Sequence, residues 1–315
     1  MPRWRSRIHN LLSMLGPALS MCLGMEMSLQ ADSSPSLAIA MVFRNEAAWL
    51  REWVEYHRLI GATKLYLYDN DSTDQVYDLL EPYIQEGLVD YTLWHSLPNT
   101  GALYCWAETT QVGAYMDAMR RCECDWIALM DSDEFLVPYE GDMRDVLQAF
   151  QQQYPEAQGF AVSWLNFGTS DVWALHPGEL LIDKLTRVSS GKTEYDGLNK
   201  LIVRTGSVER MIHPHLAKFY PGRGPMHFSG RPYVYKEPHF AEFLVAQINH
   251  YVTRTTEFFH STKMARKNSM DNCPRPDRHY RVLEQELNAK VDAARRIGRF
   301  IPPLLERMSG PSPTY

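Results

Sequence analysis

Between residues 37 and 138, short apolar runs of strand length alternate with segments whose apolar residues recur at helical spacing. Residues 37–43 (LAIAMVF) form an uninterrupted apolar run, which is typical of a strand buried on both faces of a sheet. The next stretch repeats its apolar positions at helical spacing until Gly61, where a helix would end. The alternation then continues, with strands expected at 64–68, 89–94 and 126–130 and helices at 75–85 and 108–120. This order of elements predicts an α/β protein with a mainly parallel sheet covered by helices on both faces.

The regular alternation weakens after Pro138. Residues 159–164 and 198–204 have the apolar character of strands. Residues 187–197 and 218–238 are rich in Gly, Pro and basic residues, so we expect loops there. Irregular segments of this kind usually shape a substrate pocket beside the sheet.

The C-terminal part has a different composition. Residues 277–308 are expected to form mostly one charged helical segment, which Pro302 and Pro303 interrupt. We therefore expect a main domain over 37–270 and a mostly helical extension over 271–315.

The first 36 residues form a leader and a linker. Three arginines precede an apolar run over 11–25, which Glu26 closes, and this order is typical of a signal peptide. The run is short for a transmembrane helix. A signal peptide or membrane anchor and a mis-started or amphipathic leader remain open alternatives. The protein is therefore expected to be membrane-associated through this leader or exported, or cytoplasmic if the leader is not a targeting signal.

Composition narrows the function classes. The 315 residues are 45% hydrophobic and 22% charged, which is the balance of a packed soluble protein. The net charge of −6 provides no basic field for nucleic acid, so we expect no nucleic-acid partner. The five cysteines form no paired CxxC sets, and we expect Cys122 and Cys124 to be buried structural residues.

Polar clusters follow the predicted parallel strands, at the ends where such sheets bind ligands. Asp131 and Asp133 come directly after the apolar strand 126–130 and are separated by one residue. Residues i and i+2 of an extended segment point the same way, so two carboxylates can hold a divalent cation that neutralises a diphosphate. The alternative is that they only cap the next helix.

A second acidic cluster follows strand 64–68. Residues 69–74 (DNDSTD) lie where a doubly wound sheet would hold a nucleoside, and carboxylates accept hydrogen bonds from a base or ribose. Ser72 would also cap the following helix. In the second half of the chain, His213 follows a strand and is a candidate third ligand of the metal.

Several of these segments together resemble glycosyltransferase family 92 and related bacterial family-2-like enzymes. The segments are VFRNEAAWLREWVEYHRLIGATKLYLYDNDSTD, DWIALMDSDEFLVP, 164–168, 200–213, and a closing motif with Asn249, His250, Tyr251, Arg254, Glu257 and Lys263. The resemblance extends from about residue 37 to 267. It implies a GT-A-type α/β fold, a nucleotide-sugar donor, Mn²⁺ or Mg²⁺ as cofactor, and inversion at the anomeric carbon.

The resemblance also implies roles for individual residues. Asp131, Asp133 and His213 would bind the metal, and Trp164 and His250 would lie on the acceptor side. The donor would be bound by Asn45, Glu46, Asp69, Asn70, Asp74 and Lys200. An inverting enzyme needs a general base, for which we select Asp171, with Glu194 and Asp196 as alternatives.

The sequence therefore predicts a metal-dependent inverting glycosyltransferase. It would move a hexose from a nucleotide sugar, UDP being favoured, to a hydroxyl of a glycan or lipid-linked acceptor. A sugar nucleotidyltransferase would want a glycine-rich phosphate loop after the first strand, and residues 43–47 (FRNEA) contain no glycine. An inactive glycan-binding protein would be expected to lack one of the two aspartates.

Overall fold

The structure is a computed structural model that describes residues 34–96, 110–193, 196–237, 240–264, 277–292 and 294–310. Residues 1–33, which make up most of the predicted leader, lie outside the described residues. The remainder of the chain forms one compact unit.

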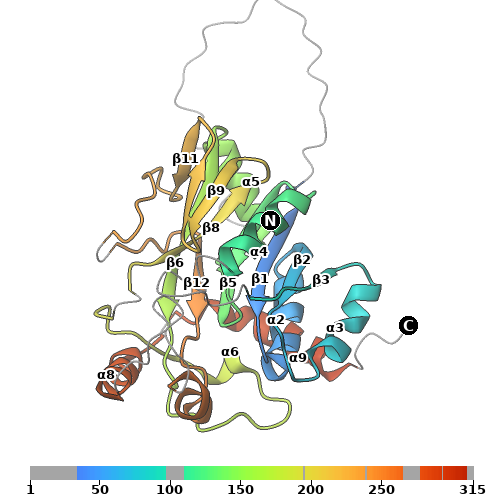
Figure 1. Ribbon diagram of the computed structural model, residues 1–315. Coiled ribbons are helices and arrows are strands. Elements are labelled where there is room, and N and C mark those ends of the chain that lie inside the picture. Colours follow the sequence, from blue (N-terminus) through green and yellow to red (C-terminus); the bar gives the residue numbers. More distant parts are fainter. Residues whose placement is uncertain are drawn as a thin grey trace, which may run out of the picture. The chain divides into compact units, whose positions relative to one another are not determined.

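A mixed sheet organises the described chain (Figure 1). Its strands follow one another in the order β3 (Val89–Leu93), β2 (Ala62–Asp69), β1 (Leu37–Phe43), β4 (Trp126–Met130), β8 (Asn199–Arg204), β6 (Ala157–Asn166), β12 (Ala246–His250) and β5 (Glu134–Pro138). The pairs from β3 to β4 are parallel, β8 is antiparallel to both of its neighbours, and β5 is antiparallel to β12. β11 (Arg223–Met226) adds to β6 in parallel. The predicted mainly parallel α/β sheet is confirmed.

Helices and short strands complete the described fold. The helices are α2 (Ala47–Leu59), α3 (Val76–Gln85), α4 (Val112–Arg121), α5 (Met143–Gln153), α6 (Leu181–Lys184), α7 (Thr256–Phe258), the π-helix η2 (Phe259–Lys263), α8 (Asp277–Leu287), the 3₁₀ helix η3 (Arg296–Phe300) and α9 (Ile301–Ser309). A hairpin of β9 (Val208–His213) and β10 (Leu216–Phe219) and a small sheet of β7 (Arg187–Val188) and β13 (Lys290–Val291) lie outside the main sheet. No helix among the described residues has the length and apolar character needed to cross a bilayer.

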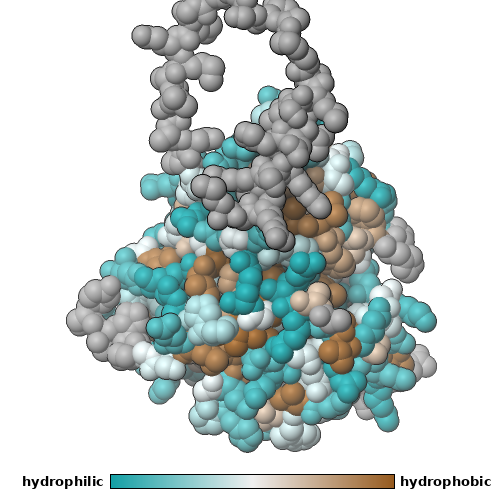
Figure 2. All heavy atoms as spheres, turned by 180° about the vertical axis from the view of Figure 1, so that it is seen from behind, coloured by the Kyte–Doolittle hydropathy of each residue, from teal (hydrophilic) through white to brown (hydrophobic). Residues whose placement is uncertain are grey.

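Both faces of the sheet are buried, as the uninterrupted apolar strands predict. Alternate residues of β1 belong to different hydrophobic clusters, with Ile39 in one and Ala40 in the other. The first cluster packs against α2, and the second packs against α4 through Ala114 and Tyr115. Polar and apolar residues are interspersed on the surface seen in Figure 2, where the apolar ones form several separate patches.

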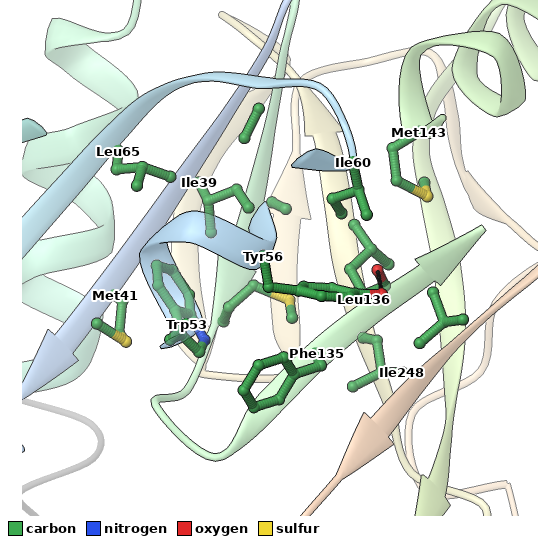
Figure 3. Packing of buried hydrophobic residues seen from close by; sticks show 14 of the residues in the cluster. Ile39, Met41, Trp53, Tyr56, Ile60, Leu65, Phe135, Leu136, Met143 and Ile248 are labelled. Carbon is green, nitrogen blue, oxygen red and sulfur yellow. Dashed lines mark hydrogen bonds between the residues drawn. The ribbon is translucent and has the colours of Figure 1, made fainter. Parts of the chain in front are cut away.

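Helix α2 connects the parallel strands to β5. Figure 3 shows Trp53 and Tyr56 of this helix between the β1 side chains and Phe135. Trp53 Nε1 donates a hydrogen bond to the carbonyl oxygen of Glu134 at 2.9 Å, and the Tyr56 hydroxyl donates to that of Leu136 at 3.0 Å. The helix therefore holds β5 by hydrogen bonds as well as by apolar packing.

The segment after residue 270 belongs to the same compact unit as the sheet. Arg307 of α9 lies 3.3 Å from Glu55 of α2, and Asn288 Oδ1 accepts a hydrogen bond from the Ser170 backbone N–H at 2.7 Å. The prediction that this segment is mostly one helix broken at its prolines is wrong. The break lies at 288–300, where β13 and η3 form, whereas both prolines occupy the first turn of α9, where proline needs no hydrogen-bond partner.

The two cysteines of the CxC segment lie in the connection between α4 and β4. Cys122 is buried and Cys124 is partly exposed, and both are thiols rather than disulfides. Cys122 packs in the hydrophobic cluster beside α4, as expected for a structural residue.

Glu52 attaches the start of α6 to α2. Its carboxylate oxygens accept hydrogen bonds from the backbone N–H groups of Leu181 and Ile182 at 2.9 and 3.1 Å. Burial raises the pKa of this carboxyl group to about 7 in spite of these hydrogen bonds. The fold therefore buries an acid that titrates near neutral pH.

Removal of the Trp53 side chain tests the connection between α2 and β5. We expect Trp53→Ala to lower the free energy of unfolding by about 3–5 kcal/mol, because it leaves a cavity and an unpaired carbonyl oxygen. Trp173 is 65% exposed, so Trp173→Ala is the matched control. This variant should change the free energy of unfolding by less than about 0.5 kcal/mol. Urea denaturation measures both values, and equal losses would contradict the assignment.

The raised pKa of Glu52 predicts a pH-dependent stability. A carboxyl group whose pKa is higher in the folded chain favours folding while it is protonated, so its contribution falls as pH rises from 4.5 to about 7. Over this interval the wild type should lose roughly 2–3 kcal/mol relative to Glu52→Gln, since one pKa unit is about 1.4 kcal/mol. Urea denaturation at about pH 5 and about pH 8 measures the difference. If the free energies of unfolding of wild type and Glu52→Gln differed by the same amount at both pH values, the raised pKa of Glu52 would be contradicted.

Candidate active site

Strand ends from both halves of the chain meet at one edge of the sheet. β4 ends there and leads into residues 131–133, and β8 begins there because it is antiparallel to β4. His250, the last residue of β12, is paired with Asn166 at the end of β6 and with Glu134 at the start of β5. The sheet thus brings together residues that are more than 100 positions apart in sequence.

The turn that carries the two predicted metal aspartates is closed by hydrogen bonds. The backbone N–H of Asp131 donates to Glu134 Oε2 at 2.9 Å, and the N–H of Glu134 donates to the Asp131 carbonyl oxygen at 3.2 Å. The Asp133 carbonyl oxygen accepts a hydrogen bond from the Tyr251 N–H at 2.8 Å. We call residues 131–134 the acidic turn.

Lysines neutralise the acidic turn. Lys200 is fully buried, and its Nζ lies 2.9 Å from Asp131 Oδ2 and 3.6 Å from Glu134 Oε1. Burial alone would lower the pKa of this lysine, but the two carboxylates raise it above its ordinary value. Lys263 Nζ lies 3.3 Å from Asp133 Oδ2, and its side chain is 29% exposed. Both lysines are therefore charged counter-ions of the turn, and Lys263 is the more accessible.

The carboxyl groups of the turn respond differently to burial. Burial opposes ionisation of Asp131 and Asp133, yet Lys200 and Lys263 respectively hold their pKa values below the ordinary range. For Glu134 burial dominates and raises the pKa well above its ordinary value. The two predicted metal aspartates are thus the ionised members of the turn.

Arg254 connects the acidic turn to the loop after β1. This buried residue has a left-handed backbone with φ 54°. Its Nη1 lies 2.5 Å from Glu46 Oε2, and its Nη2 donates to Ser132 Oγ at 3.1 Å. The guanidinium carbon lies 5.2 Å from the ring centroid of Trp49 and 4.7 Å from that of Phe258. The sequence placed Arg254 in the closing motif but assigned it no role.

His250 and Trp164, predicted for the acceptor side, also lie at this edge. The ring centroids are 4.0 Å apart, and His250 Nε2 lies 3.6 Å from Asp133 Oδ1. Burial lowers the pKa of His250 to about 4, so the imidazole is neutral at pH 7. His213 instead stacks on His215, and its ring nitrogens lie 3.3 and 3.4 Å from the Tyr235 hydroxyl.

The structure does not assemble the predicted three-ligand metal site. Over the described ranges, no three His, Cys, Asp or Glu side chains are arranged to share a metal ion. Asp131 and Asp133 lie in one turn, while His213 is at the tip of the β9–β10 hairpin. Of the two histidines, His250 has a ring nitrogen 3.6 Å from an aspartate oxygen, that of Asp133.

The predicted donor-binding loops after β1 and β2 hold each other in place. Asn45 Oδ1 accepts a hydrogen bond from the Thr73 N–H at 2.7 Å, and Asp74 Oδ2 accepts from the N–H of Ala47, the first residue of α2, at 2.8 Å. Asp74 therefore satisfies one of the unpaired N–H groups at the start of that helix.

Asp69 and Asn70 are buried at the end of β2. Asp69 Oδ2 accepts a hydrogen bond from the Tyr91 hydroxyl at 2.6 Å, and Asn70 Nδ2 donates to the Trp94 carbonyl oxygen at 2.8 Å. Asp69 Oδ1 also accepts a hydrogen bond from the Ser72 N–H at 2.8 Å, so the predicted hydrogen-bonded turn is correct.

The prediction that Ser72 caps the following helix is wrong. Ser72 Oγ instead accepts a hydrogen bond from the Asn45 N–H at 2.9 Å, and the cap of α3, Gln75, makes no side-chain capping hydrogen bond. Contact of residues 69–74 with a nucleoside stays a prediction.

The candidate general bases lie in different surroundings. Asp171 has φ 61°, and its carboxylate is 75% exposed and lies 3.4 Å from Arg187. Asp196 accepts hydrogen bonds from Asn166, Ser189 and Thr193. Glu194 lies outside the described residues.

A cavity of about 930 Å³ lies between α2, the loop 174–180 and η2. Trp49, Glu52 and Phe258 line it. Asn45 and Thr255 also line it, and they are neighbours in sequence of Glu46 and Arg254. Arg254 contacts the acidic turn at Ser132, and Glu46 is the ion-pair partner of Arg254. The sequence did not reveal this cavity because its walls come from four separate segments, 45–52, 174–180, 255–262 and Met308.

Comparison with known proteins gives a family match. The chain matches the model of glycosyltransferase family 92 over residues 36–291. A family 92 protein of Oryza sativa subsp. japonica is 33% identical over 118 residues, which are 36% of this chain and 18% of that protein. A family 92 protein of Ricinus communis is 26% identical over 161 residues, 50% of this chain and 27% of that protein. The chain thus spans less than a third of the length of these two relatives.

Solved structures show more distant similarity. S. aureus TarS has a TM-score of 0.34 and 13% identity, covering 54% of this chain and 28% of TarS. M. tuberculosis glucosyl-3-phosphoglycerate synthase has a TM-score of 0.27 and 13% identity, covering 43% of this chain and 46% of the synthase.

The family match covers most of the described sheet and the whole acidic turn. Together with the mainly parallel sheet, it bears out the GT-A-type α/β fold expected from the sequence. The chain therefore belongs to glycosyltransferase family 92.

Proposed function

We propose that this protein transfers a hexose from a nucleotide sugar, UDP being the favoured nucleotide, to a hydroxyl of a glycan or glycolipid. The observation that carries the proposal is the acidic turn. Two ionised aspartates, Asp131 and Asp133, stand at the ligand-binding edge of the sheet with basic side chains around them. A site with both carboxylates and basic side chains suits a reaction in which a diphosphate leaves better than it suits the binding of a neutral ligand.

The basic residues would stabilise the leaving diphosphate, Lys263 by direct contact and the buried Lys200 and Arg254 through their charge. Lys263 and Arg254 approach the acidic turn from the segment after β12, and Lys200 approaches it from β8. Charge-assisted hydrogen bonds to phosphate oxygens are strong, and they gain strength as negative charge develops on the leaving group. Lys263 is the group most able to move, because its side chain is partly exposed.

The aspartates fit a divalent cation that the donor helps to bind. Mn²⁺ or Mg²⁺ in such sites is held by one or two carboxylates together with substrate phosphates and water. Asp131 and Asp133 would supply the carboxylates, with His250 rather than His213 as the nearer imidazole. When bound, the ion would neutralise charge on the diphosphate. Since Lys200 and Lys263 already contact these carboxylates, we expect weak metal binding without the nucleotide.

We propose Asp171 as the general base of an inverting displacement. The acceptor oxygen must attack opposite the diphosphate, so the base must stand across the sugar from the acidic turn. Asp171 is exposed, and its turn leads into the loop 174–180 that lines the cavity. Asp196 is less suited, because its carboxylate oxygens already accept four hydrogen bonds.

The role of the acidic turn is tested by nucleotide release from UDP-, GDP- and CMP-sugars with Mn²⁺. We expect Asp133→Asn to lower release by about 10² or more, as for loss of a group that stabilises developing charge. Asp78 is exposed in the first turn of α3, and Asp78→Asn is the control. Near-normal release by a folded Asp133→Asn would contradict the site, and release of pyrophosphate would indicate a nucleotidyltransferase.

Replacement of Asp171 tests the base. Asp171→Asn should keep donor affinity and lower turnover by roughly 10²–10⁴, the usual contribution of a positioned base. Arg187→Ala removes the ion-pair partner of Asp171 and is the control for a structural effect. Equal losses in both variants would indicate a structural role. NMR analysis of the product should show inversion, and a retained anomeric configuration would contradict the mechanism.

A further inference from the structure

We infer that the cavity between α2, the loop 174–180 and η2 binds a neutral carbohydrate, which is the acceptor glycan. This inference rests on the proposed function and adds the place and chemical class of the acceptor. The cavity volume of about 930 Å³ is near the top of the usual range for small-molecule sites, which leaves room for more than one sugar unit.

The cavity lies next to the proposed reaction centre. Trp49 and Phe258, which line it, are also the two rings that Arg254 contacts. The same guanidinium donates a hydrogen bond to Ser132, the middle residue between the two aspartates. One side chain therefore separates the cavity wall from the acidic turn. A glycan in this cavity could present one hydroxyl toward the donor.

Aromatic and hydroxyl groups in the lining match the surface of a sugar. Trp49 and Phe258 meet edge to face with ring centroids 5.8 Å apart, which provides an apolar surface for sugar C–H groups. Ser261 and Thr262 add hydroxyl groups on η2 that can donate and accept hydrogen bonds.

The charges of the lining favour a neutral ligand over the donor diphosphate. Three glutamates line the cavity, Glu52, Glu179 and Glu257, against one arginine among the described residues. That arginine, Arg51, donates a hydrogen bond to the Gly310 carbonyl oxygen. Burial raises the pKa of Glu52 to about 7, and Glu179 is paired with Lys184. The lining therefore carries little net charge, which suits sugar hydroxyls better than a diphosphate. The basic side chains stand instead at the acidic turn.

Substitution of Ser261 by tryptophan fills the cavity without touching the acidic turn. The probes are neutral trisaccharides, namely mannotriose, cellotriose and galactotriose, used in transfer assays and in saturation-transfer NMR. We expect Ser261→Trp to raise the KM for the acceptor about tenfold or more, an affinity loss of at least 1.4 kcal/mol. His260→Trp, on the exposed side of η2 and outside the lining, is the matched control. Thr262→Trp is the second variant if Ser261→Trp does not fold.

Nucleotide release without acceptor separates this inference from the proposed function. Equal loss of acceptor-free release and of transfer in Ser261→Trp would assign the cavity to the donor and overturn the inference. An unchanged acceptor KM would overturn it as well. If the wild type releases no nucleotide from any donor, the proposed function fails. In that case, saturation-transfer NMR signals from a trisaccharide with the wild type, lost in Ser261→Trp, would still support a carbohydrate site in the cavity. Absence of such signals with the wild type would refute the carbohydrate site.

Discussion

The ion pair between Lys200 and Asp131 is the constraint around which the site is built. The acidic turn places three carboxyl groups within four residues, and burying them without compensation would be prohibitively costly. Lys263 of η2 pairs with Asp133, and Lys200 of β8 offsets the cost for Asp131 and Glu134. The insertion of β8, antiparallel between β4 and β6, places Lys200 beside the turn. The antiparallel strand that interrupts the parallel order is thus the one that supplies the buried counter-ion of the turn.

The first half of the fold could be predicted because its information is local. β1 and β4 are continuous apolar runs, and β4 was predicted with its observed bounds, Trp126–Met130. β5 and β12 were not predicted. β5 follows the acidic turn directly and resembles its continuation, and β12 is a five-residue segment with three polar residues, which is buried only because β5 and β6 flank it.

The site was predictable to a similar extent. Asp131 and Asp133 are recognisable because their spacing and their position after a strand are local features. Arg254 and Glu52 were not assigned roles, because their partners lie more than 100 residues away and no spacing rule connects them. The choice between His213 and His250 had the same difficulty, since it depends on where the β9–β10 hairpin and β12 pack. Long-range packing therefore decides the part of the site that sequence patterns leave open.

The hydrogen bonds from α2 to β5 affect the tendency of this protein to self-associate. β5 is the last strand of the sheet, and an open edge of this kind can pair with a strand of another molecule. Here Trp53, Tyr56 and His57 occupy the backbone groups of Glu134 and Leu136 that an incoming strand would need. Aggregation by strand addition is thereby blocked at the edge nearest the two aspartates.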